Sequence, residues 1–199
     1  SAVAIDTAGQ NVTFGTALAA TQTGGLQKMG AGTLTITKTN LNTGTTTIYA
    51  GTLKIDAGAG GALPNLPLTF NVGATPYTVS AGSPTLKYDN TTAAGAKSQS
   101  MAALTFSAGE GTVQLARTAA FPVSLTFSSL AGRTAGAVRN FVYSGTPGTI
   151  GTDSAINLTG AALGFIDAGA FVNGADYAYM NAAGTYVRAP VYGTDTGFT

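Results

Sequence analysis

The chain contains no histidine and no cysteine, and only 9% of its 199 residues are charged. Without cysteine there is no disulfide framework and no thiolate metal site, and without histidine the commonest general base and the commonest metal ligand are missing. The nine basic and eight acidic residues form no run of either sign and leave a net charge of +1. Such a chain lacks the basic footprint of proteins that bind nucleic acids or anionic membranes. We therefore expect no nucleic-acid partner, no metal and no cofactor.

Long apolar runs are also missing. No segment approaches the roughly 18 apolar residues that a helix needs to cross a bilayer, so we expect no membrane span. The chain begins at Ser1 without a methionine or a leader, from which we expect either a removed signal peptide or a segment of a longer protein. Its low charge and high threonine content favour a protein that works outside the cell.

What the chain does contain is apolar and glycine-rich. Hydrophobic residues make up 44%, mean hydropathy is +0.23, and there are 28 glycines. This is enough apolar material for the core of a single domain. Threonine and valine favour strands, glycine favours the corners between them, and the glutamate and lysine that usually cover helices are scarce. The composition predicts an all-β fold.

One phrase occurs twice, Ala-Gly-Thr-Leu-Thr-Ile at 31–36 and Ala-Gly-Thr-Leu-Lys-Ile at 50–55, with an offset of 19 residues. In both copies, leucine and isoleucine alternate with polar residues, which is typical of short strands with one buried face. Because such a strand cannot bury that face alone, the period indicates a solenoid in which successive coils stack on one another.

The same spacing continues along the chain with some drift. Treating its leucines as equivalent gives steps of 15 to 21 residues, which predicts one coil of about 18–20 residues per step and two or three strands in each coil. The leucines are Leu34, Leu53, Leu68, Leu86, Leu104 and Leu125. Glycines fall where corners are needed, at Gly51, Gly73, Gly82, Gly109 and Gly111.

We predict one solenoid unit over residues 1–199, with three differing parts. Residues 1–24 contain two short strands that could cover the first coil or dock onto another copy. The docking candidates are Val3, Ile5, Val12 and Phe14. Residues 25–131 are regular coils, and residues 132–199 are either less regular coils or a cap. The alternative fold is an antiparallel β-sandwich of the pilin kind.

Residues 24–56 resemble the autotransporter-associated β-strand repeat, whose members run GGL-x-K-x-GxGTLxL and then GxTxIxxGTLxL. The matching segments are Gly-Gly-Leu-Gln-Lys at 24–28, Gly-Ala-Gly-Thr-Leu at 30–34, Gly-Thr-Thr-Thr-Ile at 44–48 and Gly-Thr-Leu at 51–53. Met29 departs from the small polar residue usual there. The resemblance implies a right-handed parallel β-helix in a large secreted bacterial surface or fibre protein, and it carries no catalytic motif.

Two groups of side chains are candidates for chemistry. Asp56 and Asp89 each end a Thr-Leu-Lys-x-Asp segment, near Lys54 and Lys87, and could form a saccharide or cation site. We expect solvated ion pairs instead. Late aromatic residues could form a platform for glycans or an interface, or could simply pack in the core. The main candidates are Phe171, Tyr177, Tyr179 and Tyr186, and the wider set adds Phe165, Tyr192 and Phe198.

The pattern specifies an architecture better than an activity. We expect no enzyme but an extracellular structural protein that associates with itself, end to end or as segments of a longer chain. This expectation rests on the unpaired strand edges at the two ends of a solenoid, which other strands can cover. The alternatives are a glycan-binding adhesin module and, as a more distant one, a polysaccharide-degrading β-helix enzyme.

Overall fold

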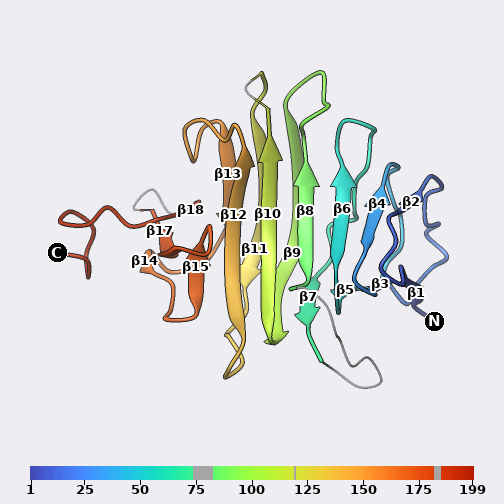
Figure 1. Cartoon of the computed structure of the whole chain (residues 1–199), viewed down its shortest axis with the longest axis horizontal. Coiled ribbons are helices and arrows are strands. Elements are labelled where there is room, and N and C mark those ends of the chain that lie inside the picture. The colour runs from blue at the N-terminus through green and yellow to red at the C-terminus, as the bar shows by residue number, and fades with distance from the viewer. Residues whose placement is uncertain (74–82, 119, 182–184) are drawn as a thin grey trace.

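The computed structural model describes residues 1–73, 83–118, 120–181 and 185–199. Within these ranges the chain is all β, with no helix. The described part therefore contains no helix with the length and apolar character to cross a membrane. The strands lie side by side in chain order from the N-terminal to the C-terminal end of an elongated molecule (Figure 1).

Two long parallel sheets make up most of the molecule. The first has the strand order β1-β3-β5-β7-β9-β11-β13. Its strands are β1 (Val3–Asp6), β3 (Leu26–Met29), β5 (Thr46–Ile48), β7 (Leu68–Asn71), β9 (Lys97–Ala108), β11 (Val123–Leu130) and β13 (Ser154–Leu158). The second has the order β16-β15-β12-β10-β8-β6-β4-β2, and all of its pairings except β15 with β16 are parallel. Its strands are β2 (Val12–Phe14), β4 (Thr33–Ile36), β6 (Thr52–Asp56), β8 (Thr85–Asp89), β10 (Glu110–Arg117), β12 (Val138–Gly145), β15 (Ala170–Val172) and β16 (Asp176–Tyr177).

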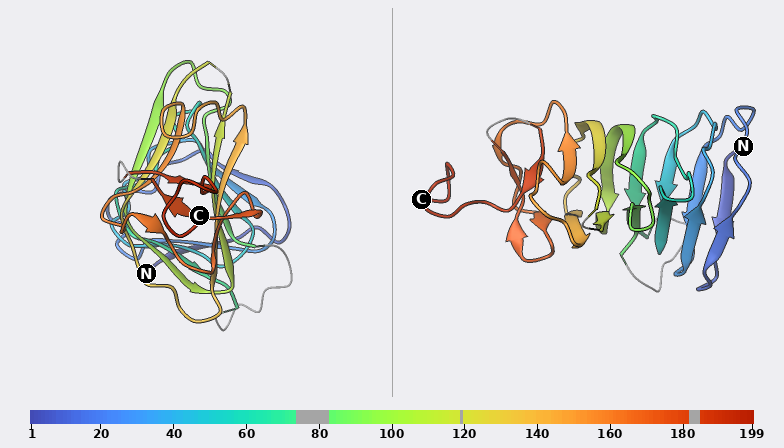
Figure 2. Two further views of the ribbon diagram at one scale, coloured as in Figure 1. Left: turned by 90° about the vertical axis from the view of Figure 1, so that its left-hand side faces the viewer. Right: turned by 90° about the horizontal axis from the view of Figure 1, so that it is seen from above.

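From β1 to β13, consecutive strands alternate between the two sheets, so each pass of the chain adds one strand to each of them (Figure 2). The doubled phrase is in register, because Leu34 pairs with Leu53 and Ile36 with Ile55 in parallel strands. The prediction that these two segments stack is confirmed, and the antiparallel sandwich is wrong for residues 31–55.

A single apolar core joins the two sheets. Apolar side chains at alternate positions of the strands are buried. In β4, for example, the buried Leu34 and Ile36 alternate with the half-buried Thr33 and Thr35. Phe106 on β9 stacks on Phe70 of the same sheet, with ring centroids 4.9 Å apart. It also meets Phe141 of the other sheet edge to face, at 6.4 Å. Packing across the sheets is therefore direct.

The predicted coil length is wrong beyond the doubled phrase. Thr33 pairs with Thr52, 19 residues later, but Thr52 pairs with Thr85 after 33 residues and Leu68 with Leu104 after 36. The leucine series mixed the two sheets: Leu34, Leu53 and Leu86 lie in the second sheet, and the other three lie in the first. Several of its steps therefore span half a coil, because leucine points inward in both sheets.

The corner glycines divide into three groups. Gly51, Gly73 and Gly109 have φ between +62° and +73°, which only glycine adopts without strain, so corners are present there. Gly111 instead lies within β10, where an added Cβ would come within 2.7 Å of the Phe70 ring. Its small size makes room for the phenylalanine stack. Gly82 lies outside the described residues.

Beyond residue 131 the chain first continues the sheets and then changes architecture. β12 pairs with β10 from Val138 to Gly145, so residue 132 marks no structural break. Further on, the antiparallel partner β16 covers the last parallel strand of the second sheet. The strands β14 (Gly164–Phe165), β17 (Tyr179–Met180) and β18 (Val187–Arg188) form a small antiparallel sheet. The strand pairing in this region is therefore parallel first and antiparallel after it.

Candidate functional site

The late aromatic residues gather at the C-terminal end. We define the C-terminal aromatic cluster as Phe165, Phe171, Tyr177, Tyr179, Tyr192 and Phe198. The centroid of the Phe198 ring lies 5.6–6.4 Å from the ring centroids of Phe165, Tyr177, Tyr179 and Tyr192. Tyr177 meets Phe165 edge to face at 5.4 Å and stacks on Phe171 at 5.6 Å. Strands β14, β15, β16 and β17 and the segment after β18 thus contribute to one group of rings.

An ion pair holds the last segment of the chain in this cluster. Both Nη atoms of Arg188 donate hydrogen bonds to the Asp195 carboxylate, at 2.5 and 2.7 Å, and the Val191 N–H donates to it as well. These hydrogen bonds lower the pKa of Asp195 to about 2. The Arg188 guanidinium also lies 4.8 Å from the centre of the Tyr179 ring. The segment that carries Phe198 is therefore folded back onto the small antiparallel sheet.

Part of the cluster is open to solvent. Phe165 is 45% exposed and Tyr177 is 40% exposed, whereas Tyr179 is buried. Phe165, Tyr177, Gly197 and Phe198 line a hollow of about 280 Å³. An exposed aromatic hollow can hold an apolar or a sugar face. Tyr192 is 62% exposed but does not line the hollow. Phe165 and Tyr177 are thus the exposed rings at the hollow, while Tyr179 has a packing role.

Tyr186 is not part of this cluster. It pairs with Asn157 of β13 through an isolated antiparallel bridge. Its ring lies over Gly151, where an added Cβ would come within 2.3 Å of it. The sequence pattern could not separate it from Tyr177 and Tyr179, because all three lie in the same aromatic-rich stretch.

The proposed docking strands already pair within their own chain. β1 pairs with β3, and β2 pairs with β4. Val3, Ile5 and Phe14 are half-buried against the core, and Val12 is 36% exposed. The outer backbone edge of β1 and β2 has no strand partner among the described residues, and we call it the N-terminal edge (Figure 2).

The charged group of β6 and β8 is a closed set of ion pairs. Asp56 and Asp89 pair directly in the neighbouring strands β6 and β8. One Asp89 oxygen accepts from Lys54 Nζ at 3.0 Å and Lys87 Nζ at 3.2 Å, and the other accepts from Thr91 N and Oγ1. Burial alone would raise the pKa of Asp89, but these partners lower it to about 2. Both oxygens are occupied, which leaves Asp89 poorly suited to bind a cation.

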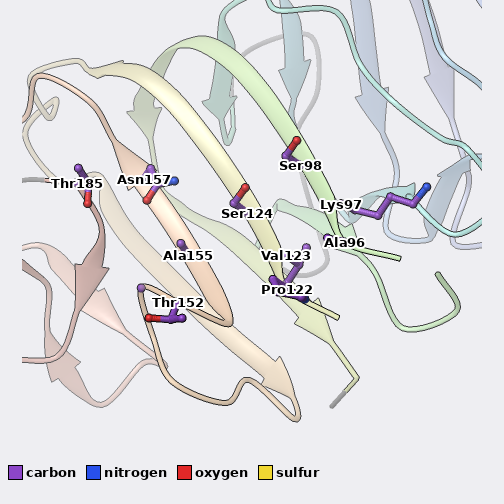
Figure 3. A pocket seen from close by; sticks show the side chains of 11 residues that line it. Ala96, Lys97, Ser98, Pro122, Val123, Ser124, Thr152, Ala155, Asn157 and Thr185 are labelled. Carbon is purple, nitrogen blue, oxygen red and sulfur yellow. The ribbon is translucent and has the colours of Figure 1, made fainter. Parts of the chain in front are cut away.

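Another hollow lies on the outer face of the first sheet and has a volume of about 520 Å³. Figure 3 shows Ser98, Ser124 and Asn157 on three adjacent strands beneath it, with Lys97 at one side. Hydroxyl and amide groups there could bond to a polar ligand. The described residues that line it include no aromatic ring and no carboxylate, so none of them selects one ligand class.

A second cavity contains three ionisable side chains that the sequence analysis did not single out as a site. We call it the arginine cavity. It has a volume of about 300 Å³, and its lining includes Arg133, Arg139, Asp167 and Phe165. The only sequence signal was the appearance of two arginines six residues apart in a chain with few charges. Their convergence on one aspartate depends on the fold.

Lys28 is a further charged residue whose position only the structure reveals. It is completely buried, and its Nζ donates to the carbonyl oxygens of Met29, Gly30 and Ala50 at 2.7–3.1 Å and to Thr7 Oγ1 at 3.1 Å. These acceptors lie at or just beyond the ends of β1, β3 and β5, so one amine links three adjacent strands of the first sheet. Its role is to satisfy buried backbone groups, and it leaves no open site.

In the described part of the chain, no group of three or more acidic residues lies close enough together to hold a metal ion. Comparisons of the chain with models of known protein families, with curated proteins and with solved structures found no match. The family resemblance of residues 24–56 therefore remains an expectation from the sequence.

Proposed function

We propose that the two parallel sheets are faces of one right-handed β-solenoid and that the chain is a structural unit of an extracellular protein. The alternation of successive strands between the two sheets supports a coil with one strand on each face. Crossover connections between parallel strands are right-handed in nearly all proteins, which supports the handedness. The in-register stacking of the doubled phrase supports the resemblance to autotransporter-associated repeats, and with it a location on a bacterial surface.

The observation that carries the structural role is the N-terminal edge. β1 and β2 each pair on one side only, among the residues described. The opposite end is different, because the second sheet ends there in the two-residue antiparallel strand β16, and residues 185–187 lie antiparallel against β13. An open edge accepts another strand through backbone hydrogen bonds. We propose that this edge pairs with a second copy or with an adjoining segment of a longer chain.

The test is to block this edge with proline. Val3 N donates to Gly25 O, so the N–H of the next residue, Ala4, faces the open side, because alternate residues of a parallel strand bond to the same neighbour. Ala4→Pro removes that donor and leaves the pairing with β3 intact. We expect the 199-residue protein to associate as its concentration rises, and Ala4→Pro to weaken the association at least tenfold in sedimentation equilibrium.

Ala4→Thr is the matched control, since it changes the same exposed residue and keeps the N–H. It should associate like the wild type. Circular dichroism of all three proteins checks that the strands remain. A wild-type protein that stays monomeric at every concentration, with an intact β spectrum, would rule out self-association of this unit.

A second candidate function, glycan binding, is favoured by the exposed rings of the C-terminal aromatic cluster. Sugars present apolar faces that pack on aromatic rings, and Phe165 and Tyr177 offer such rings at the edge of a hollow. On a glycan array, we expect Tyr177→Ala to lose most of the bound signal. Leu41→Ala, at a residue that is 57% exposed and far from the cluster in sequence, serves as the control. Equal binding by Tyr177→Ala and the wild type would refute this function.

We propose no catalytic role. The polysaccharide-degrading alternative required Asp56 or Asp89 to act on a substrate. Asp89 is 4% exposed and fully engaged by Lys54, Lys87 and Thr91. These contacts favour a structural function for the pair.

A further inference from the structure

The arginine cavity has an excess of positive charge. Two of the ionisable side chains that line it are arginines and one is an aspartate. Asp167 uses both oxygens, since Oδ1 accepts from Arg133 Nε at 3.0 Å and Oδ2 accepts from Arg139 Nη1 at 2.5 Å. Oδ1 also accepts from the Gly169 N–H. The single carboxylate neutralises the charge of only one of the two guanidinium groups, so the cavity keeps a net charge of one positive unit.

Arg139 provides a fixed charge at this cavity. It is 3% exposed, its Nη2 donates to Ala131 O at 2.7 Å, and its guanidinium lies 5.6 Å from the centre of the Phe106 ring. Its Nε is buried and has no hydrogen-bond partner. Burial lowers the pKa of Arg139, Asp167 raises it, and the nearby Arg133 lowers it further. An incompletely compensated buried cation is costly, and a bound anion would reduce that cost.

Arg133 supplies the accessible donor. Its side chain is 27% exposed. Nε and Nη1 bond to Asp167 and to Ala137 O, and Nη2 has no partner among the described residues. The guanidinium lies against Gly169, where an added Cβ would come within 2.7 Å of Cζ. The group is thus held by two contacts with one nitrogen left free, which suits it to receive a carboxylate.

The wall beside these charges is aromatic. Phe165, 45% exposed, lines both the arginine cavity and the hollow that it shares with Tyr177. A volume of about 300 Å³ lies at the small end of the range for ligand sites, roughly 300–1,000 Å³. A ligand fitting both features carries a carboxylate next to a ring with an apolar face.

We infer that the arginine cavity binds the carboxylate of a uronic acid, the acidic sugar unit of anionic polysaccharides. Arg133 bonds to the carboxylate, Arg139 supplies the fixed positive charge, and Phe165 packs on the sugar ring. The inference rests on the second candidate function, which it makes specific to acidic glycans. It is independent of self-association through the N-terminal edge.

The test is a titration of the isotope-labelled 199-residue protein with sodium glucuronate, followed by NMR signals of the backbone and of the arginine Nε–H groups. We expect saturable shifts at Arg133, Arg139 and Phe165, with no comparable response to glucose at equal concentration. Arg133→Gln should weaken glucuronate binding at least tenfold. Lys38→Gln, which removes the same charge at an exposed residue elsewhere, should bind like the wild type.

A further variant and a titration with acetate distinguish a sugar site from a general anion site. Phe165→Leu should weaken glucuronate severalfold and leave the weaker response to acetate unchanged, and this variant keeps the test valid if Arg133→Gln unfolds. Glucuronate binding that is absent in the wild type, or unchanged in a folded Arg133→Gln protein, overturns the inference. An acetate response equal to that of glucuronate overturns the sugar assignment. Neutral glycans that bind through Tyr177 without any glucuronate response would refute the inference and preserve the second candidate function.

Discussion

Replacing Lys28 by alanine should lower the free energy of unfolding by about 3 to 5 kcal/mol. The change removes the buried four-carbon stem and leaves three carbonyl oxygens, on Met29, Gly30 and Ala50, without the amine that bonds to them. Met29 O keeps its hydrogen bonds from Thr7, so the lost bonds matter most at Gly30 O and Ala50 O. The lost hydrogen bonds and the new cavity both destabilise, and they add here because one side chain provides both contributions. Chemical denaturation followed by circular dichroism measures the effect.

Lys28→Met separates the two contributions, since it fills most of the space and makes none of the hydrogen bonds. We expect a loss of about 2 kcal/mol for this variant. A methionine variant as stable as the wild type would show that the hydrogen bonds between coils contribute little. Lys38→Met, at an exposed lysine, is the matched control and should change stability by less than about 0.5 kcal/mol.

The pH dependence gives an independent check on Lys28. Burial lowers its pKa from 10.5 to about 8, and the charge of Asp6 opposes the shift only in part. Between these pH values the unfolded chain holds a proton that the folded chain has released, so the free energy of unfolding rises with pH. The stability difference between the wild type and Lys28→Met should therefore grow by about 1 to 3 kcal/mol from pH 8 to pH 10.5.

Phe106→Ala should lower the free energy of unfolding by about 3 to 5 kcal/mol. Phe106 is completely buried, stacks on Phe70 within the first sheet and meets Phe141 of the second. Its removal opens a cavity where the two sheets pack, and Gly111, which has no side chain, cannot fill the space. Arg139 also loses the ring beneath its guanidinium.

Phe106→Leu tests the same position with a smaller change in volume, and we expect it to cost about 1 to 1.5 kcal/mol. Leu41→Ala, at a residue 57% exposed, should change stability by less than about 0.5 kcal/mol. Guanidinium denaturation curves for the three variants give the comparison. A loss below about 1 kcal/mol for Phe106→Ala would contradict direct packing of the two sheets.

Several features of the fold could be predicted from local pattern. Alternation in Leu34 and Ile36 and again in Leu53 and Ile55 predicted strands that stack in register, and the structure confirms it. The leucines used for the spacing also lie in strands, for example Leu86 in β8 and Leu125 in β11. Alternation of period two is a property of each strand by itself, which is why sequence alone reveals it.

The candidate sites were predictable only in part. An aromatic-rich stretch made Tyr177 and Phe171 candidates, and the fold does bring them together with Phe165 and Phe198. Tyr186 lies elsewhere, and Tyr179 is buried. Exposure depends on which segments fold back over a ring, and no local pattern encodes that.

By itself the sequence determined an all-β chain, the inward side of its main strands and the stacking of the doubled phrase. The tertiary structure decided which strands are neighbours, because loop closure costs little more for a coil of 36 residues than for one of 19. Only the folded chain reveals that Lys28 bonds to residues at or just beyond the ends of three adjacent strands and that Arg133 and Arg139 both bond to Asp167. Such contacts depend on the register between distant strands, which pattern within a strand cannot specify.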